Sequence, residues 1–322
     1  MNFQDLHNVE DSKFYLDQAF KKSKRQGETV FPRTSGDQLQ RMIRTESEKL
    51  KVFNKTLTEF LDAIVKKFPS VDNLPEFYNE LLRLTVDYDY LKKSLGSLTW
   101  ASGKLEELFR SYSKSLRSCQ SRLDVNKLMK GYYGRTSSVM RQIDKFLKYI
   151  EESRKIMKNY PTLKTDLFTV AITGFPNIGK STLLSKLTPA KPEIRDYAFT
   201  TKNLNQGYAD YGLRKVQFVD TPGVLDRDKT NAIESQAYLV LKYLVHLIVY
   251  VIDLTEPYPL KQQEELLKKL KDLDKPIIIY LSKTDIIDPK IFAKAKKKYK
   301  AVISVDELNK KIEKAIKGHY FE

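Results

Sequence analysis

The sequence predicts two domains of different fold class. An all-α antiparallel helical bundle is expected over residues 1–165, and a doubly wound α/β domain with a mostly parallel sheet over residues 166–322. The length of 322 residues allows two domains of ordinary size. Up to about residue 165 the apolar residues recur at helical spacing, whereas beyond it short β-branched and apolar runs alternate with helical segments.

The first half is expected to form long helices. The clearest covers residues 38–68, where apolar residues recur at every third or fourth position until Pro69 ends the pattern. The other helical segments are expected over residues 10–26, 73–95, 103–124 and 137–159. Glycine and proline fall mostly between these segments, so short loops should join antiparallel neighbours.

The second half is expected to hold buried parallel strands, because its apolar runs are short, continuous and rich in valine and isoleucine. The predicted strands are residues 167–173, 215–220, 246–253, 276–282 and 301–304. Helical segments such as residues 180–187 and 260–273 lie between them, which is the alternation of a doubly wound fold.

The composition is that of a folded protein with an excess of positive charge. Hydrophobic residues make up 41% of the chain and charged residues 30%, and the formal net charge is +16. Residues 111–164 hold 13 basic and 4 acidic residues, a net charge of +9, and a second lysine-rich stretch covers residues 289–300. Such clusters indicate a polyanionic partner, either RNA, DNA or an anionic membrane; the alternative is a solvated lysine-rich surface.

The sequence favours a cytoplasmic protein without a membrane span. Cys119 is the only cysteine, so no internal disulfide can form, as expected in a reducing compartment. The first residues are acidic and lack the apolar segment of a signal peptide, and no run of about 18 apolar residues occurs.

The segment GFPNIGKST, residues 174–182, matches the pattern G-x-x-x-x-G-K-[ST]. It stands between a predicted strand and a predicted helix, the context that a phosphate-binding loop (P-loop) requires. Glycines let the backbone wrap around phosphates, and N–H groups at the helix start point toward them. Lys180 is expected to neutralise phosphate oxygens, and the Ser181 hydroxyl to bind Mg²⁺. The predicted nucleotide contacts in this loop are Gly174, Pro176, Asn177, Ile178, Gly179, Lys180, Ser181 and Thr182.

A second segment, VDTPG at residues 219–223, also ends a predicted strand. Asp220 is suited to hold Mg²⁺ through water, and the Gly223 N–H can meet a γ-phosphate. Val224 follows at the position where many GTPases place a water-orienting glutamine. Because valine cannot orient water, we expect GTP hydrolysis either to be slow or to depend on another group in place of the glutamine.

Together with VDTPG, the segments SKTD (282–285) and AVISVDE (301–307) favour GTP over ATP. SKTD, residues 282–285, nearly matches the guanine signature [NT]-K-x-D, in which Asp285 accepts two hydrogen bonds from guanine and the Lys283 stem lies along the base. Ser282 replaces the usual Asn or Thr. Asparagine at this position braces the P-loop, and serine can do less of this, so we expect a weaker affinity for the nucleotide. Ser304 and the Val305 N–H are expected near guanine O6.

These residues resemble the Obg-like branch of GTPases, and more narrowly the nucleolar GTP-binding protein family of ribosome-assembly GTPases. The resemblance rests on PNIGKST, on YAFTTKNLNQGY (197–208) and on VDTPGVLDRDKTNAIESQA (219–237), and it extends upstream to residues 16–25 and 132–161. It covers nearly the whole chain and implies a P-loop GTPase domain. Eukaryotic members are similar but carry a longer C-terminal extension, so the chain resembles an archaeal-type member.

The resemblance implies roles for the switch residues. In the FTT segment, residues 199–201, Thr201 is expected to bind Mg²⁺ when GTP is present, and Thr200 is the less favoured candidate. Lys180, Thr201 and Gly223 are the expected catalytic residues. A hydrophobic residue at the position of Val224 is shared by the family.

Asn177 has two interpretations. It stands where several related GTPases bind a potassium ion, so K⁺ is a second expected cofactor beside Mg²⁺. Asparagine also suits a left-handed turn, and the two interpretations have about equal weight.

The resemblance also implies a partner, the large ribosomal subunit precursor and its rRNA, which the helical domain is expected to contact. The candidate phosphate contacts are Lys127, Lys130, Arg135, Arg141, Lys145 and Lys148. Tyr132 and Tyr133 can stack on unpaired bases or pack between helices, and packing is favoured for at least one of them. Away from the ribosome the chain is expected to be monomeric.

The predicted function is a GTPase that binds GTP and GDP with Mg²⁺, hydrolyses GTP slowly and acts as a switch in large-subunit assembly. One alternative is a nucleotide-dependent binding module with negligible turnover. Another is a membrane-associated GTPase, although the basic helix lacks an apolar face with Trp or Phe anchors. His7, His246 and His319 are scattered and suggest no metal cluster, and Asp253 is expected to cap a loop.

Overall fold

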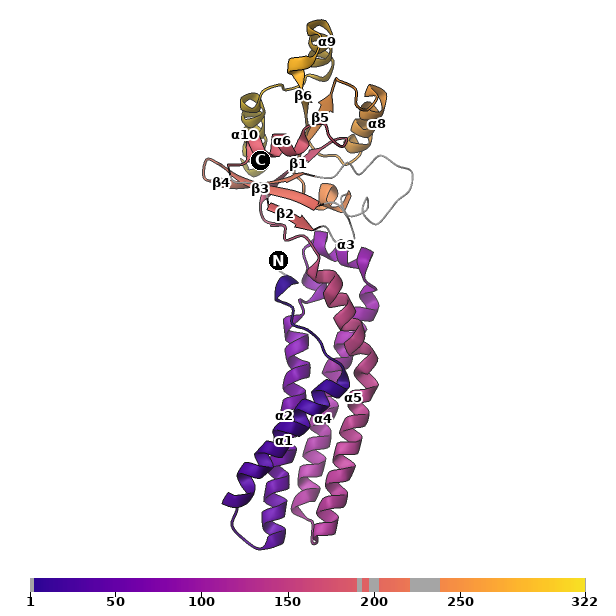
Figure 1. The fold of residues 1–322 in the computed structure, drawn as a ribbon, viewed down its shortest axis with the longest axis vertical. Helices are drawn as coiled ribbons and strands as arrows, with labels where there is room; N and C mark the ends of the chain where they lie inside the picture. The colour runs from indigo at the N-terminus through magenta and orange to yellow at the C-terminus, as the bar shows by residue number, and fades with distance from the viewer. Residues whose placement is uncertain (1–2, 190–192, 197–202, 221–237, 322) are drawn as a thin grey trace. The chain divides into compact units, whose positions relative to one another are not determined.

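A computed structural model describes residues 3–189, 193–196, 203–220 and 238–321. The chain divides into two compact units (Figure 1). The helical unit comprises Phe3–Asn73 and Thr85–Lys158, and the sheet unit comprises Leu74–Leu84 together with the chain from residue 159 onward. An all-helical part followed by a mixed, mostly parallel sheet confirms the predicted fold class.

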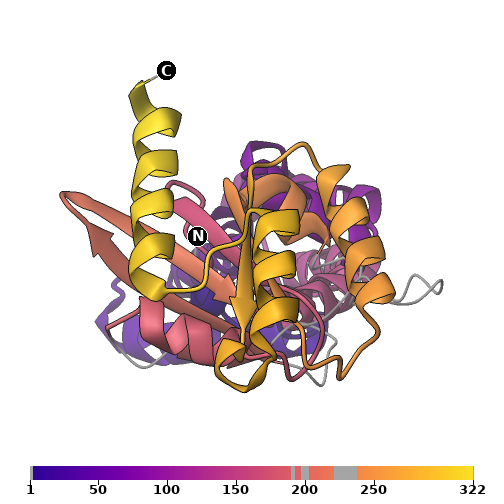
Figure 2. The ribbon, with the colours of Figure 1, turned by 90° about the horizontal axis from the view of Figure 1, so that it is seen from above.

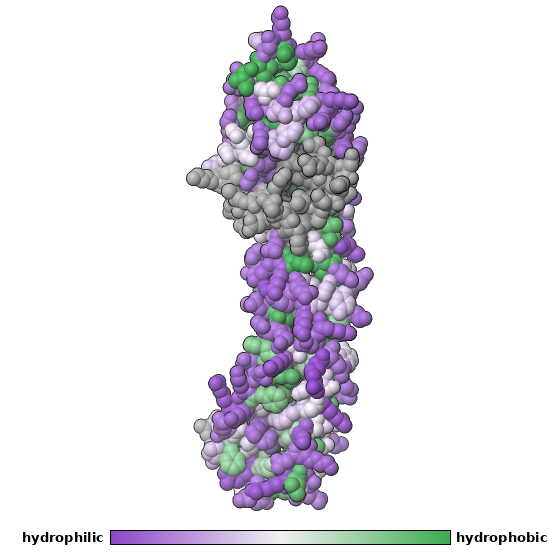
Figure 3. All heavy atoms as spheres, turned by 45° about the vertical axis from the view of Figure 1, so that its right-hand side comes forward, coloured by the Kyte–Doolittle hydropathy of each residue, from purple (hydrophilic) through white to green (hydrophobic). Residues whose placement is uncertain are grey.

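The helical unit is built from long helices that pack in the order α1, α2, α4, α5. They are α1 (Ser12–Val30), α2 (Gln38–Lys67), α4 (Tyr88–Arg117) and α5 (Arg122–Lys158), with short 3-10 turns η1 (Phe3–Asp5), η2 (Phe31–Arg33) and η3 (Val71–Asn73). Asp11, Asp37 and Asp87 cap the first three, each side chain accepting a backbone N–H three residues on. Hydrophilic side chains predominate on the face of this unit seen in Figure 3, as expected of amphipathic helices that bury one side.

The helix boundaries differ from those predicted at several positions. The helix expected over residues 103–124 ends at Arg117, and α5 begins at Arg122, well before the expected residue 137. The segment expected as one helix over residues 73–95 is interrupted, because α3 (Glu76–Thr85) ends and Asp87 starts α4. Conversely, α4 continues through Gly96 and Gly103, where a break was expected. Both glycines are exposed, so the buried leucines on the other side of α4 hold the helix despite the weak helix propensity of glycine.

The segment Leu74–Leu84 is fixed within the sheet unit by one tyrosine. Tyr78 is fully buried on α3, and its hydroxyl accepts the Leu163 N–H at 3.0 Å. The same hydroxyl lies 2.9 Å from the Pro161 carbonyl oxygen and 3.0 Å from that of Leu163, to which it can donate. Burial raises the pKa of Tyr78 to about 12, so this hydroxyl stays protonated. The tyrosine thereby ties α3 to the chain just before the sheet.

Within the described residues, the sheet has six strands in the order β2-β3-β4-β1-β5-β6. They are β1 (Phe168–Thr173), β2 (Glu193–Asp196), β3 (Asn203–Tyr211), β4 (Arg214–Asp220), β5 (Leu247–Asp253) and β6 (Ile277–Ser282). β1 pairs parallel with β4 and β5, and β6 parallel with β5, whereas β2 and β3 are antiparallel. The polar strand β3 was not predicted, and residues 301–304 form a single parallel bridge, Tyr280 to Val302, in place of the expected strand.

Helices cover both faces of this sheet (Figure 2). α6 (Lys180–Leu187) and α10 (Val305–Phe321) lie on one face, and α8 (Leu260–Lys271) lies on the other. The remaining elements are α9 (Pro289–Tyr299), the π-helical turn η4 (Val240–Leu244) and the 3-10 turn η5 (Thr284–Ile286). Among the helices described, none is both long enough and apolar enough to cross a membrane.

His246 connects β1 and β5 at their amino ends. Its Nδ1 accepts the Thr169 N–H at 3.1 Å, and its ring lies edge-on to His319, 4.6 Å between centroids. Burial, together with the nearby His319 and Lys275, lowers the pKa of His246 to about 4. The imidazole is therefore neutral in the folded protein, as an accepting Nδ1 requires.

This histidine predicts an acid-side loss of stability. In the unfolded chain His246 takes up a proton near pH 6.5, but in the folded chain only near pH 4, so the free energy of unfolding should fall as pH drops between these values. His246→Asn keeps an acceptor but cannot titrate, and it should flatten that slope in urea unfolding measured from pH 7 to pH 4. The control is the exposed His7→Asn; equal slopes in all three proteins would contradict the prediction.

Candidate functional site

The carboxyl ends of four strands meet at one edge of the sheet. The backbone register pairs Ile172 of β1 with Asp220 of β4, and Asp253 of β5 with Ser282 of β6. The segments singled out in the sequence therefore share this edge, which is where parallel α/β sheets bind ligands.

The loop between β1 and α6 has the backbone that its glycines predict. Gly174 has φ +147°, and a Cβ there would lie 2.5 Å from Ile178 Cδ1 and 2.7 Å from the Val251 carbonyl oxygen. Gly179, at φ +95°, is the cap residue from which α6 begins. Asn177 is left-handed at φ 59°, which gives the turn interpretation a structural basis and leaves potassium binding a prediction.

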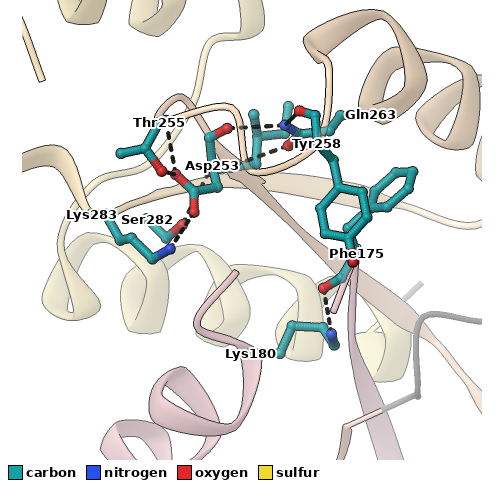
Figure 4. A network of polar contacts seen from close by, with 9 residues as sticks. Phe175, Lys180, Asp253, Thr255, Tyr258, Gln263, Ser282 and Lys283 are labelled. Carbon is teal, nitrogen blue, oxygen red and sulfur yellow. Dashed lines mark hydrogen bonds and ion pairs between the residues drawn. The ribbon is translucent and has the colours of Figure 1, made fainter. Parts of the chain in front are cut away.

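Lys180 is the first residue of α6 and is 8% exposed. Its Nζ donates to the Phe175 carbonyl oxygen of the same loop at 2.7 Å (Figure 4). Ile178 is fully buried beneath the loop, whereas Pro176 is half-buried and Thr182 exposed. The ammonium thus lies against the loop backbone, where an anion held by the loop would be in reach.

Ser181 and Asp220 come together although 39 positions separate them. The Ser181 Oγ donates to Asp220 Oδ2 at 2.7 Å, and the Asn205 amide donates to the same oxygen at 3.2 Å. Asp220 is 6% exposed, and no group among the described residues donates a hydrogen bond to its buried Oδ1. A hydroxyl beside a buried, incompletely satisfied carboxylate is the oxygen donor set that Mg²⁺ prefers, so these residues fit that ion.

The SKTD segment ends β6 and turns sharply. Ser282 closes the strand, and its hydroxyl donates to the Ile252 carbonyl oxygen at 3.3 Å. Lys283 is left-handed, with φ 50°, and starts the turn that carries Asp285, whose side chain is exposed. The Lys283 ammonium forms an ion pair with Asp253, Nζ to Oδ2 2.6 Å.

Sequence reasoning assigned Asp253 only a loop-capping role. The cap exists, because Oδ1 accepts both the Thr255 N–H at 2.9 Å and its hydroxyl at 2.6 Å. Burial alone would raise the pKa of this carboxyl, but the hydrogen bonds from Lys283 and Thr255 outweigh it and the pKa is lowered. The link to Lys283 was missed because 30 positions separate the two residues, and the sequence does not show that their strands are neighbours in the sheet.

Gln263, on α8, holds the backbone of Asp253 (Figure 4). Its Oε1 accepts the Asp253 N–H at 3.0 Å, and its Nε2 donates to the carbonyl oxygens of Asp253 and Tyr258, both at 2.9 Å. Gln263 is fully buried and was not singled out in the sequence. Its three hydrogen bonds engage the oxygen and both N–H groups of the amide, so the end of β5 has one defined position.

The other predicted site residues are divided between described and undescribed segments. Ser304 precedes α10 and accepts the Glu307 N–H at 3.2 Å, and Val305 is the first residue of that helix. The Tyr280–Val302 bridge brings this segment beside β6. Thr200, Thr201, Gly223 and Val224 lie outside the described residues.

All six cations predicted to contact RNA lie on α5 and are exposed. Lys148 forms an ion pair with Asp144 at 2.7 Å, and the Arg135 guanidinium lies over the Tyr112 ring at 5.8 Å. Tyr132 is fully buried, so it packs between helices and cannot stack on a base. Tyr133 is half-buried, and its ring lies 5.0 Å from that of Phe53.

Comparisons with known proteins agree with this architecture. The family profile described as "NOG1 N-terminal helical domain" matches residues 3–164, and the profile described as "50S ribosome-binding GTPase" matches residues 169–283. An uncharacterized protein of Methanocaldococcus jannaschii is 39% identical over 280 residues, which are 84% of this chain and 79% of that protein.

Eukaryotic relatives match over nearly the whole chain. Nucleolar GTP-binding protein 1 of Drosophila melanogaster is 32% identical over 294 residues, 89% of this chain but 45% of that protein, so the chain spans less than half the length of this relative. A solved structure from Plasmodium falciparum, described as a "putative nucleolar GTP-binding protein 1", is 28% identical over 43% of this chain and 73% of its own, with a TM-score of 0.36. The helical-domain match and the M. jannaschii relative together show that the chain belongs to the nucleolar GTP-binding protein family.

Proposed function

We propose that the chain binds GTP with Mg²⁺, hydrolyses it slowly, and acts as a switch during assembly of the large ribosomal subunit. The observation that carries the proposal is the pairing of Ser181 with the buried Asp220 carboxylate beside Lys180 at the start of α6. P-loop nucleotide hydrolases share three features: a P-loop, a hydroxyl that binds Mg²⁺, and an aspartate at the end of a strand that helps to hold this ion.

The protein's own groups bind and orient the triphosphate in this proposal. Backbone N–H groups of residues 177–180 face the phosphates, and Lys180 exchanges its bond to the Phe175 carbonyl for phosphate oxygens. Ser181 and Thr201 are the proposed Mg²⁺ ligands, with Asp220 acting through water. When bound, Mg²⁺ neutralises charge on the β- and γ-phosphate oxygens.

Hydrolysis then needs a water in line with the γ-phosphorus. A bond forms between the water oxygen and the γ-phosphorus while the bond to the β–γ bridging oxygen breaks, which yields GDP and phosphate. Lys180 and the loop N–H groups stabilise the charge of the transition state. Since valine stands at position 224, catalysis is proposed to be completed by ribosomal RNA or by a potassium ion at Asn177, which would supply positive charge.

The base is proposed to be guanine. Asp285 would accept the guanine N1–H and amino group, the Lys283 stem would lie along the ring, and Ser304 with the Val305 N–H would face O6. This preference is supported by the described turn after β6, which brings Asp285 to the same sheet edge as the P-loop.

The proposed partner is the precursor of the large ribosomal subunit, met in the cytoplasm. Lys127, Lys130, Arg141 and Lys145 recur at spacings that place them along one face of α5, with Gly134 and Ser138 between them. Exposed cations in a row suit a nucleic-acid backbone, and contacts of this kind bind by charge and shape without reading sequence.

Replacing these four cations by alanine should weaken binding to purified large subunits. Each lost phosphate contact should reduce the slope of log affinity against log salt by about 0.7–0.9. A comparison variant carries the same charge loss on α9, at the exposed Lys290, Lys294, Lys296 and Lys297. Filter binding from 50 to 300 mM salt separates the two; an unchanged slope for the α5 variant would argue against this face.

The proposed function is tested by GTP hydrolysis with and without large ribosomal subunits, in potassium and in sodium buffer. Stimulation by the subunit is expected and would locate the missing catalytic group there. A potassium effect without the subunit would point to Asn177. If neither raises the rate but GTP changes subunit binding, a nucleotide-dependent binding module is the better account. Failure to bind GTP would overturn the proposal.

A further inference from the structure

We propose that Asp253 is a positioning residue for guanine recognition, because its buried carboxylate anchors Lys283 and, through Lys283, the turn that presents Asp285. The inference rests on the proposed GTP site and adds to that site a residue that itself contacts no nucleotide.

The first argument is the asymmetry of the ion pair. Asp253 is fully buried while the Lys283 side chain is 38% exposed, and their charged atoms lie 2.6 Å apart. Lys283 also adopts a left-handed conformation, which non-glycine residues keep only when their surroundings impose it. The fixed partner is therefore the carboxylate, and the residue held by it is the lysine.

The second argument is that Asp253 is fixed from several directions. Thr255 donates two hydrogen bonds to Oδ1, and the Gln263 amide binds the backbone N–H and carbonyl of Asp253. Oδ2 is left to face Lys283. A carboxylate constrained in this way can set the place of a flexible lysine, whereas a mobile one could not.

The third argument is the hydrogen bond that the Ser282 hydroxyl forms with β5. Its hydroxyl donates to the Ile252 carbonyl oxygen within the sheet. The turn is therefore fastened to β5 twice, by Ser282 through the backbone of Ile252 and by Lys283 through Asp253. Because the Ser282 hydroxyl binds the backbone of β5, it does not contact Lys283. The ion pair with Asp253 is therefore the contact that fixes the Lys283 side chain.

The test is Asp253→Asn, read by equilibrium binding of fluorescent GTP, GDP and ATP. Affinity for GTP and for GDP should fall equally, by about tenfold or more, because the base is common to both. Affinity for ATP should stay unchanged, so the preference for guanine falls by the same factor. The matched control Asp274→Asn, at an exposed turn residue after α8, should change nothing.

A double-mutant cycle separates positioning from a general structural role. If Asp253 acts through Lys283, Asp253→Asn should cost no further guanine affinity in a Lys283→Met background. Additive losses, or equal losses for GTP and ATP, would overturn the inference. Should Asp253→Asn not fold, Thr255→Val removes the hydroxyl hydrogen bond to the carboxylate, while the backbone N–H of residue 255 still donates to it. This variant should lower the affinity for GTP and GDP and leave that for ATP unchanged.

The outcomes also distinguish the inference from the function on which it rests. A wild-type chain that prefers GTP, with an Asp253→Asn variant that binds it equally well, refutes only the role of Asp253. A wild-type chain that shows no preference for guanine refutes the proposed function itself.

Discussion

Lys180→Ala is expected to abolish nucleotide binding at micromolar concentrations. The ammonium is nearly buried against the P-loop backbone, so its removal leaves phosphate charge without its main protein counter-charge. A hydrogen bond to a charged group contributes up to about 3 kcal/mol, so affinity should fall about 100-fold. Titration calorimetry with GDP and with a non-hydrolysable GTP analogue measures the change.

Lys186→Ala is the matched control for this substitution. It removes the same side chain from the same helix at an exposed position, so affinity should be unchanged. Thermal unfolding of both variants should stay close to that of the parent chain. Equal affinity in the Lys180 variant and the parent would refute the assigned role of the loop.

Gly174→Ala should be the most destabilising small substitution in the sheet unit. The new methyl would meet Ile178 Cδ1 at 2.5 Å and the Val251 carbonyl oxygen at 2.7 Å, at a φ of +147° that alanine rarely adopts. Overpacking and backbone strain together should lower the free energy of unfolding by about 2–4 kcal/mol. Nucleotide binding should be lost as well, because the loop cannot keep its path.

Gly212→Ala serves as the comparison, because it imposes a positive φ on alanine without bringing the new methyl group into contact with other atoms. This glycine also has positive φ, +64°, but nothing lies within 4 Å of a Cβ there. Its cost should therefore be that of the left-handed backbone alone, about 1 kcal/mol. Urea unfolding of both variants is the measurement, and equal losses would show that the contacts of Gly174 do not matter.

Sequence patterns predicted the strongly apolar helices and strands. They failed for a polar strand and for a helix whose continuity depends on tertiary packing. α2 and β5 have sustained periodicity or a continuous apolar run, and both lie within one residue of their expected bounds. β3 was not predicted because its polar residues lack the apolar pattern of a strand. It is stabilised by its antiparallel pairing with β4. The continuity of α4 through two glycines likewise depends on packing that no local rule contains.

The candidate site was predictable in its motifs but not in their connections. The glycine spacing of residues 174–179 predicts the loop, whose positive φ angles bear out the reason for those glycines. The contacts between Ser181 and Asp220, and between Lys283 and Asp253, join strand ends far apart in sequence. Only the pairing of the strands brings such residues together, and that pairing is a property of the whole sheet.

The tie between Tyr78 and residues 161–163 has a consequence for how this gene can be divided. Because Leu74–Leu84 belongs to the sheet unit, the ribosome must complete the helical unit before the last partner of that segment is synthesised. A gene fragment beginning at residue 166 would encode the sheet without this helix. A recombinant that takes its first half from a homologue would therefore keep this tie only if that half supplies the tyrosine, because the partner groups at residues 161 and 163 are backbone atoms.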